Sequence, residues 1–151
     1  MIVLLCIFVL LTLIIVYSTI ENRYISTVDY TLQFDTMKRI CLIPQLESAK
    51  QRSVSQIHIV QLSDLHNCKY GKSNKGLLET VRACKPDVIL ITGDMINKYK
   101  PVGDEIYDLF EQLSGLCTCI YSLGNHELKE RERFPVRFSE YIHRIQNYGI
   151  I

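Results

Sequence analysis

The sequence lacks an excess of either charge sign, and this absence limits the kinds of partner it can have. Its 151 residues include 17 Lys and Arg and 16 Asp and Glu, which gives a formal net charge of +1 at pH 7. Proteins that bind nucleic acid usually carry a basic excess that neutralises phosphates. We therefore expect no nucleic-acid partner, and the length fits one modest domain with a real core.

The sequence also lacks the cysteine spacing of a disulfide framework or a zinc site, although it contains six cysteines. Cys117 and Cys119 flank a single threonine and could form a metal or redox pair, but cysteines on a short strand are more often small buried hydrophobes. We interpret most of the cysteines as free thiols, which suits a reducing compartment.

Charged residues are missing from positions 2 to 20, IVLLCIFVLLTLIIVYSTI. As a helix this segment would be about 28 Å long, close to the thickness of the hydrocarbon core of a bilayer. A signal peptide is the alternative, but only Met1 precedes the apolar run where basic residues are expected, and no Ala-x-Ala site follows it. We favour an uncleaved transmembrane anchor at residues 1–20, which predicts a single-pass protein of the cell membrane.

Basic residues follow this segment and none precedes it. Arg23, Lys38 and Arg39 lie on its C-terminal side. By the positive-inside rule, this asymmetry leans toward a cytoplasmic location for the globular part.

The rest of the chain alternates between strand and helix patterns. Residues 21–55 are expected to form a linker and a first strand, because apolar side chains alternate from Val28 to Phe34 and a polar stretch follows. Three further strands are predicted at 56–64, 87–94 and 117–127, with helices from about 73 to 85, 104 to 115 and 135 to 147. Ser73 or Asn74 could cap the first of these helices, and Gly115 could end the second as its C′ residue. Residues 150–151 resemble the start of another strand. This order predicts an α/β fold with parallel strands, whose site lies beyond their carboxyl ends.

Each of the three later strands ends in residues that can bind a metal. The first is followed by Asp64-Leu65-His66, the second by Gly93-Asp94 and the third by Gly124-Asn125-His126-Glu127. Each cluster alone is more often an ordinary turn, but their joint occurrence at neighbouring strand ends favours a site. In a strand, residues two apart point to the same side, so Asp64 and His66 could converge on one point. The glycines allow tight turns and close approach of the backbone.

The donor types point to a hydrolytic metal site. Carboxylate and imidazole groups suit Mn, Fe or Zn. Asp94 has two oxygens and could bridge two cations, and Asn125 offers a neutral oxygen ligand. His126 could donate a proton to a leaving oxygen.

These three clusters resemble the D-x-H, G-D and G-N-H-[DE] motifs of the calcineurin-like metallophosphoesterases. With the apolar segment in front, the chain resembles the N-terminally membrane-anchored bacterial branch, and the resemblance covers residues 56–151. It implies a β-sandwich of two sheets flanked by helices, two divalent metal ions, and hydrolysis of a phosphate ester by a metal-activated hydroxide. On the family pattern, Asp64 and His66 bind one metal, Asp94 bridges, Asn125 binds the other and His126 protonates the leaving group.

The chain departs from that pattern because the later histidine and the Gly-His-x-His motif of the family do not occur in it. His58 lies about 20 Å back along an extended strand, and His143 falls in the middle of a predicted helix, so neither fits as a replacement. We therefore expect residues 56–151 to be the N-terminal half of the domain, inactive alone. Two alternatives stay open: a truncated membrane-bound metal-binding or interaction protein without catalysis, and a single-metal hydrolase.

The substrate class is left open among phosphomonoesters, phosphodiesters and pyrophosphates. Anchoring at a membrane makes a lipid-linked phosphate or pyrophosphate one candidate.

Overall fold

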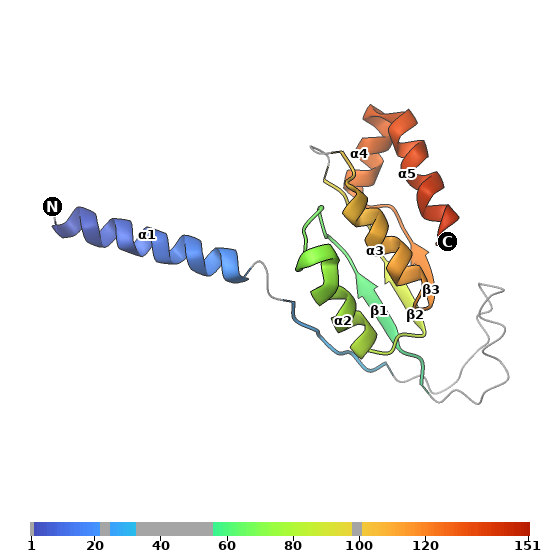
Figure 1. Ribbon diagram of the computed structural model, residues 1–151, viewed down its shortest axis with the longest axis horizontal. Coiled ribbons are helices and arrows are strands. Elements are labelled where there is room, and N and C mark those ends of the chain that lie inside the picture. The colour runs from blue at the N-terminus through green and yellow to red at the C-terminus, as the bar shows by residue number, and fades with distance from the viewer. Residues whose placement is uncertain (1, 22–24, 33–55, 98–100) are drawn as a thin grey trace.

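The computed structural model describes residues 2–21, 25–32, 56–97 and 101–151, and shows an α/β unit with one long helix at the N-terminus (Figure 1). The elements are α1 (Ile2–Glu21), β1 (Ile59–Leu62), the 3-10 turn η2 (Lys72–Asn74), α2 (Lys75–Ala83), β2 (Val88–Ile91), α3 (Asp104–Ser114), β3 (Thr118–Tyr121), α4 (Asn125–Arg133) and α5 (Pro135–Asn147). The predicted alternation of strand and helix is therefore confirmed.

The three strands form a parallel sheet in the order β1-β2-β3. Their ends are in register, because Leu62 pairs with Ile91 and Ile91 pairs with Tyr121. The described residues contain this single sheet. At the outer edge of β3, Ile151 donates its N–H to the Cys119 carbonyl and accepts from the Tyr121 N–H, which is the parallel pattern expected for the start of another strand.

Helices cover one face of the sheet, where the core lies. Figure 1 shows α2 and α3 along this face, and α3 contacts both α2 and α5. Apolar residues spaced three and four apart on α3 put one stripe of that helix against the strands. Fully buried members of the core include Ile89, Ile91, Leu109, Phe110 and Leu113. Burying such a side chain contributes about 1.5–3 kcal/mol relative to leaving it exposed.

Several local predictions about helix ends are wrong. The side chains of Ser73 and Asn74 form no capping hydrogen bond to α2, because Asn74 is left-handed (φ 55°) and its Oδ1 accepts from the Tyr70 N–H instead. Gly115 ends α3 with φ −71°, so it is not the left-handed C′ residue that was expected. Gly149, which follows α5, does adopt the left-handed conformation, with φ 77°.

The strand predicted from Val28 to Phe34 is also wrong over its described residues. Residues 27–32 form no strand, and the side chains of Val28, Tyr30 and Leu32 are exposed, because no neighbouring strand pairs with this segment. Phe34 and the polar connection at 44–55 lie outside the described residues. Of the segment after α1, Ile25 packs against the core.

α1 is long and apolar enough to cross a membrane. Its most apolar 18 residues have a mean hydropathy of 2.9, and none of these residues is buried against the other described residues. Among the described residues, α1 is therefore not a buried core helix. By length and composition alone, a signal sequence near an N-terminus passes the same test.

Candidate metal centre

The register of the sheet brings the three predicted clusters to one edge. β1, β2 and β3 end at paired residues, and each polar cluster begins within a few residues of its strand end. Neighbouring strands lie about 4.8 Å apart, so side chains from adjacent loops can meet. Three connections, β1–α2, β2–α3 and β3–α4, thus supply the candidate site.

The backbone is left-handed at the donor positions in the loops after β1 and β2. Asp64, His66 and Asp94 have φ values of 57°, 48° and 53°, and Gly93 has 86°. Such values cost free energy in non-glycine residues and are common at functional sites, where the surrounding structure holds them. The strands stop at Leu62 and Ile91 because this backbone cannot continue a β-ladder.

Hydrogen bonds between two of the loops hold this conformation. The N–H groups of Asp64, His66 and Asn67 donate to the carbonyls of residues 93, 94 and 95 at 3.1, 3.0 and 3.0 Å. The loop after β1 is therefore attached to the loop after β2 beyond the end of the sheet. This attachment explains how Asp64 and His66 come to lie together although neither is in a strand.

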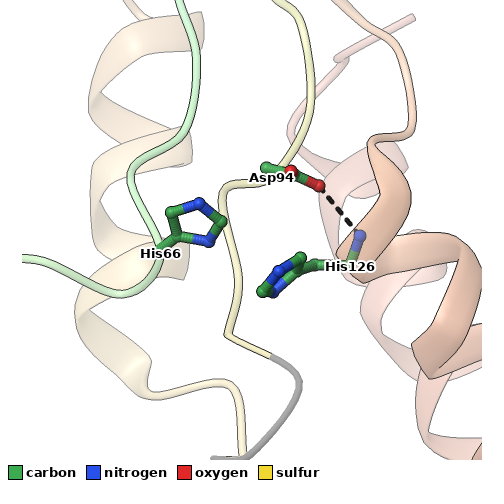
Figure 2. Close-up of side chains that lie close together, drawn as sticks. All are labelled: His66, Asp94 and His126. Atoms are coloured by element: carbon green, nitrogen blue, oxygen red, sulfur yellow. Dashed lines mark hydrogen bonds between the residues drawn. The ribbon is translucent and has the colours of Figure 1, made fainter.

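His66, Asp94 and His126 converge on one point, as Figure 2 shows. Their candidate ligand atoms all lie within 4.8 Å of one another. The two imidazole rings have centroids 4.5 Å apart at an angle of 56°. Asp94 Oδ1 accepts the backbone N–H of His126 at 2.8 Å, which attaches the start of α4 to the loop after β2.

This donor set fits a divalent cation. Two ligand atoms bound at about 2.1 Å to one ion can be at most about 4.2 Å apart. A contraction of roughly 0.6 Å would therefore bring the widest pair into coordinating distance. Imidazole nitrogen and carboxylate oxygen together suit Zn, Fe or Mn.

The other two predicted ligands lie at the margin of this group. Asp64 Oδ1 is 3.7 Å from His66 Nε2, its side chain is 65% exposed, and its Oδ2 accepts from the Ser63 hydroxyl at 2.5 Å. Asn125 is the exposed first residue of α4, directly before His126. The division of these residues between two metals stays a prediction, as does the role of His126 as a proton donor.

The two glycines of the motifs allow the close approach that the sequence predicted. A Cβ on Gly93 would overlap the backbone of Gly124. A Cβ on Gly124 would overlap the backbone nitrogen and Oδ1 of Asp94 and lie 2.8 Å from its Cγ. Both positions therefore need glycine for contact between loops, and Gly93 needs it for its left-handed φ as well.

Glu127 belongs to the third sequence motif, but the sequence assigned it no role, and the structure shows one. Its side chain is fully buried, and its carboxylate accepts four backbone N–H groups. Oε2 accepts from Asp94 at 2.8 Å and Gly124 at 2.9 Å, while Oε1 accepts from Met95 at 2.9 Å and Ile96 at 3.1 Å. A signal was present in the sequence, because a glutamate three residues after a helix N-cap commonly accepts the N-cap N–H.

The remaining histidines lie away from this edge. His58 is exposed just before β1, at the opposite end of the sheet, where its N–H donates to Asp87 Oδ2 at 2.8 Å. His143 is exposed on α5. Both were expected to be unsuitable as ligands, and this placement agrees.

The cysteines behave as free thiols among the described residues, as expected. Cys119 is buried, and burial, with a smaller contribution from Cys117, raises the pKa of its thiol to about 12. This pair therefore fits small buried hydrophobes better than a redox or metal pair.

Comparison with known proteins gives two matches. The chain is 35% identical over 60 residues to the DNA double-strand break repair protein Mre11 of Methanopyrus kandleri, which covers 37% of this chain and 13% of that protein. The chain thus spans about an eighth of the length of this relative. No solved structure matches the chain.

The second match is a family model, and it covers residues 57–150, which include all three strands and all three donor clusters. The match therefore covers the whole sheet and the edge of the sheet at which the three donor clusters lie. The chain belongs to the calcineurin-like phosphoesterase family.

Proposed function

We propose that this protein hydrolyses a phosphate ester, either a phosphomonoester, a phosphodiester or a pyrophosphate, with the help of divalent metal ions. The observation that carries the proposal is the convergence of His66, Asp94 and His126 within 4.8 Å at the edge of the sheet. Divalent cations at such a site lower the pKa of a bound water and stabilise the charge that develops on the phosphate oxygens.

The residues of this chain would hold the metal and position the substrate. His66 and Asp94 would bind a cation, with Asp64 close enough to His66 to contribute. Asp94 would bridge to a second cation that Asn125 also binds. His126 would move a proton to the leaving oxygen, and its backbone hydrogen bond to Asp94 keeps it at the site.

We further propose that α1 anchors the protein in a membrane and that the substrate is lipid-linked. Glu21 ends α1, and Ile25 packs against the core, so their Cα atoms are at most about 15 Å apart. Ile25 and Ser26 line a hollow together with Leu65 and Met95, which adjoin the donors His66 and Asp94 in sequence. The donor edge would therefore face the membrane closely enough to reach a phosphate in a headgroup.

Two finer assignments belong to the same proposal. The parallel sheet would be one half of a two-sheet sandwich, which fits the exposed Ile59 and the half-buried Leu90 on the face away from α2 and α3. The globular part would be cytoplasmic.

The family relative is named for DNA repair. The near-zero net charge of this chain gives no basic excess for DNA, so we propose no nucleic-acid partner.

The test measures metal content and hydrolysis separately. The protein, completed by the C-terminal half of the domain that the sequence predicts, is purified in detergent, supplied with Mn²⁺, and assayed on a chromogenic phosphodiester. Asp94→Asn should abolish hydrolysis, and His126→Ala should lower the rate while sparing metal content. His143→Ala, an exposed histidine on α5, is the matched control and should change neither. Full activity in Asp94→Asn would exclude the scheme.

A second candidate function is metal binding without catalysis, and it is favoured by one observation: among the described residues, one group of three possible ligands, His66, Asp94 and His126, gathers around a single point. Titration with Mn²⁺ separates the two candidates. Binding of about one equivalent with no hydrolysis supports the metal-binding protein, one equivalent with hydrolysis supports a single-metal hydrolase, and two equivalents with hydrolysis support the first proposal.

A further inference from the structure

Three consecutive backbone N–H groups after β2 donate to one side chain. The N–H groups of Asp94, Met95 and Ile96 lie 2.8, 2.9 and 3.1 Å from the carboxylate oxygens of Glu127. Successive N–H groups that share one acceptor form a concavity that binds anions. The backbone is left-handed at Gly93 and Asp94, where this concavity begins. The loop that carries Asp94 is therefore built around an internal anion, and Glu127 supplies it.

Backbone dipoles stabilise a negative charge on Glu127 although its side chain is fully buried. A fourth N–H group, that of Gly124, donates to Oε2 at 2.9 Å, so each carboxylate oxygen accepts two bonds. Glu127 also lies in the first turn of α4, where the positive end of the helix dipole favours an anion. A carboxylate suits this position because it accepts at both oxygens and donates at neither.

The backbone of residues 93–96 is consequently held from both sides. Its carbonyls at 93, 94 and 95 accept from the loop after β1, and its N–H groups at 94, 95 and 96 donate to Glu127. The Asp94 side chain is bound as well, because its Oδ1 accepts the backbone N–H of His126 (Figure 2). Asp94 thus contacts the first turn of α4 through both backbone and side chain. These contacts support a left-handed conformation that an unsupported aspartate adopts only at a cost.

We propose that Glu127 is a positioning residue, whose carboxylate holds the loop after β2 in the conformation that presents Asp94 to a metal. Glu127 is not itself assigned as a ligand, because its two oxygens already accept four N–H groups. The metal part of this inference rests on the proposed function. The positioning part concerns the protein without metal and can be measured without it.

The experiment compares Glu127→Gln with Glu130→Gln in the full chain, purified in detergent. Glutamine has nearly the size of glutamate, but its NH₂ group would face two of the four N–H groups that the carboxylate accepts. Glu130 is the matched control, because its side chain is also buried on α4 but forms an ion pair with the Arg137 side chain on α5.

The first readout is amide hydrogen exchange in metal-free protein, where the lost charge of Glu127 cannot act by attracting a cation. Glu127→Gln should speed exchange about tenfold at Asp94, Met95 and Ile96, because these amides lose their acceptor, and leave the β2 amides unchanged. Glu130→Gln should leave both groups of amides unchanged.

The second readout is the dissociation constant for Mn²⁺. Loss of a group that supports a metal ligand typically costs about 10–100-fold in affinity, so Glu127→Gln should weaken binding about tenfold or more and Glu130→Gln less than about twofold. Glu127→Asp keeps the negative charge on a side chain that is one methylene shorter. It should speed exchange at the same three amides by a smaller factor, and it serves as the test variant if Glu127→Gln does not fold.

Two outcomes would overturn the inference: exchange at residues 94–96 that matches the wild type in the Glu127 variants, or faster exchange spread evenly over the sheet. Faster exchange at residues 94–96 together with wild-type affinity for Mn²⁺ would overturn its metal part. If the wild-type protein binds no Mn²⁺, the proposed function fails, while the exchange data still decide whether Glu127 positions the Asp94 loop.

Discussion

Replacement of Gly124 by alanine tests the geometry of the site most directly. Gly124 has φ −89° and ψ −176°, an extended backbone that alanine adopts without strain. Any effect must therefore come from its added Cβ, which would lie 2.8 Å from Asp94 Cγ and overlap the Asp94 backbone nitrogen. Carbon atoms in contact prefer about 3.5–4.0 Å, so Asp94 or Gly124 must move by about 0.7–1.2 Å.

This displacement is larger than the roughly 0.6 Å contraction that coordination would need. We expect the variant to bind Mn²⁺ 10–100-fold more weakly. Overpacking of this kind costs about 1–3 kcal/mol of stability. For a domain of this size, each kcal/mol lowers Tm by about 4–8 °C.

Two other glycines provide controls for this variant. Gly149 has φ 77° and no atom within 4 Å of an added Cβ, so its alanine variant should lose about 1–2 kcal/mol through backbone strain alone and keep wild-type metal affinity. Gly115 has φ −71°, and its nearest contacts would be 3.5 and 3.6 Å, so its variant should be neutral or gain about 0.4–1 kcal/mol.

The assay pairs calorimetric titration of Mn²⁺ with thermal unfolding followed by circular dichroism, on protein in detergent. Wild-type affinity together with wild-type Tm in Gly124→Ala would refute the close packing of Gly124 on Asp94, and with it the arrangement of the donors.

Three further predictions follow from burial and exposure. Leu109 is fully buried on α3, so Leu109→Ala should lower the free energy of unfolding by about 2–5 kcal/mol, measured by urea denaturation. The pKa of the Cys119 thiol is raised from 9.0 to about 12, so at pH 8 iodoacetamide should label exposed Cys68 and leave Cys119 unlabelled until the protein unfolds. The raised pKa also means that the folded state favours the protonated thiol. The free energy of unfolding should therefore fall as the pH rises from about 9 toward 12. Removal of residues 2–21 should move the protein from the membrane fraction to the supernatant in an alkaline carbonate wash. If the measured mass of the unaltered protein includes these residues, a cleaved signal is excluded.

Much of the fold could be predicted because its signals are local. The apolar runs before Asp64 and Asp94 and the three-and-four spacing on α3 each reflect burial, which the sequence pattern records directly. The alternation from Val28 to Phe34 misled because the same pattern predicts a strand only if a partner strand is present to pair with it.

The convergence of the donors was predicted, but for a partly wrong reason. Alternation along a strand was expected to aim Asp64 and His66 at one point, whereas both residues follow β1 in left-handed conformations. Their proximity depends on hydrogen bonds to the loop after β2, and such bonds between loops leave no periodic trace in a sequence.

The support of Asp94 was beyond prediction for a related reason. Glu127 lies 31 to 33 residues from three of the four N–H groups that it accepts, those of Asp94, Met95 and Ile96. The fold brings these groups together by placing the start of α4 beside the loop after β2. A buried glutamate in a motif can signal that such a network exists, but not which groups form it.

His66 and Asp94, the ligands of the proposed site, come from two different connections of the sheet, so neither connection supplies both of them. Binding of an ion at the proposed site would therefore be linked to folding, because an ion that finds its ligands only in the assembled sheet shifts the balance away from the unfolded ensemble. At a free ion concentration one hundred times the dissociation constant, this linkage amounts to about 2.7 kcal/mol, a substantial share of the 5–15 kcal/mol by which domains are typically stable. Ion supply would then govern how long the protein persists as well as whether it can act.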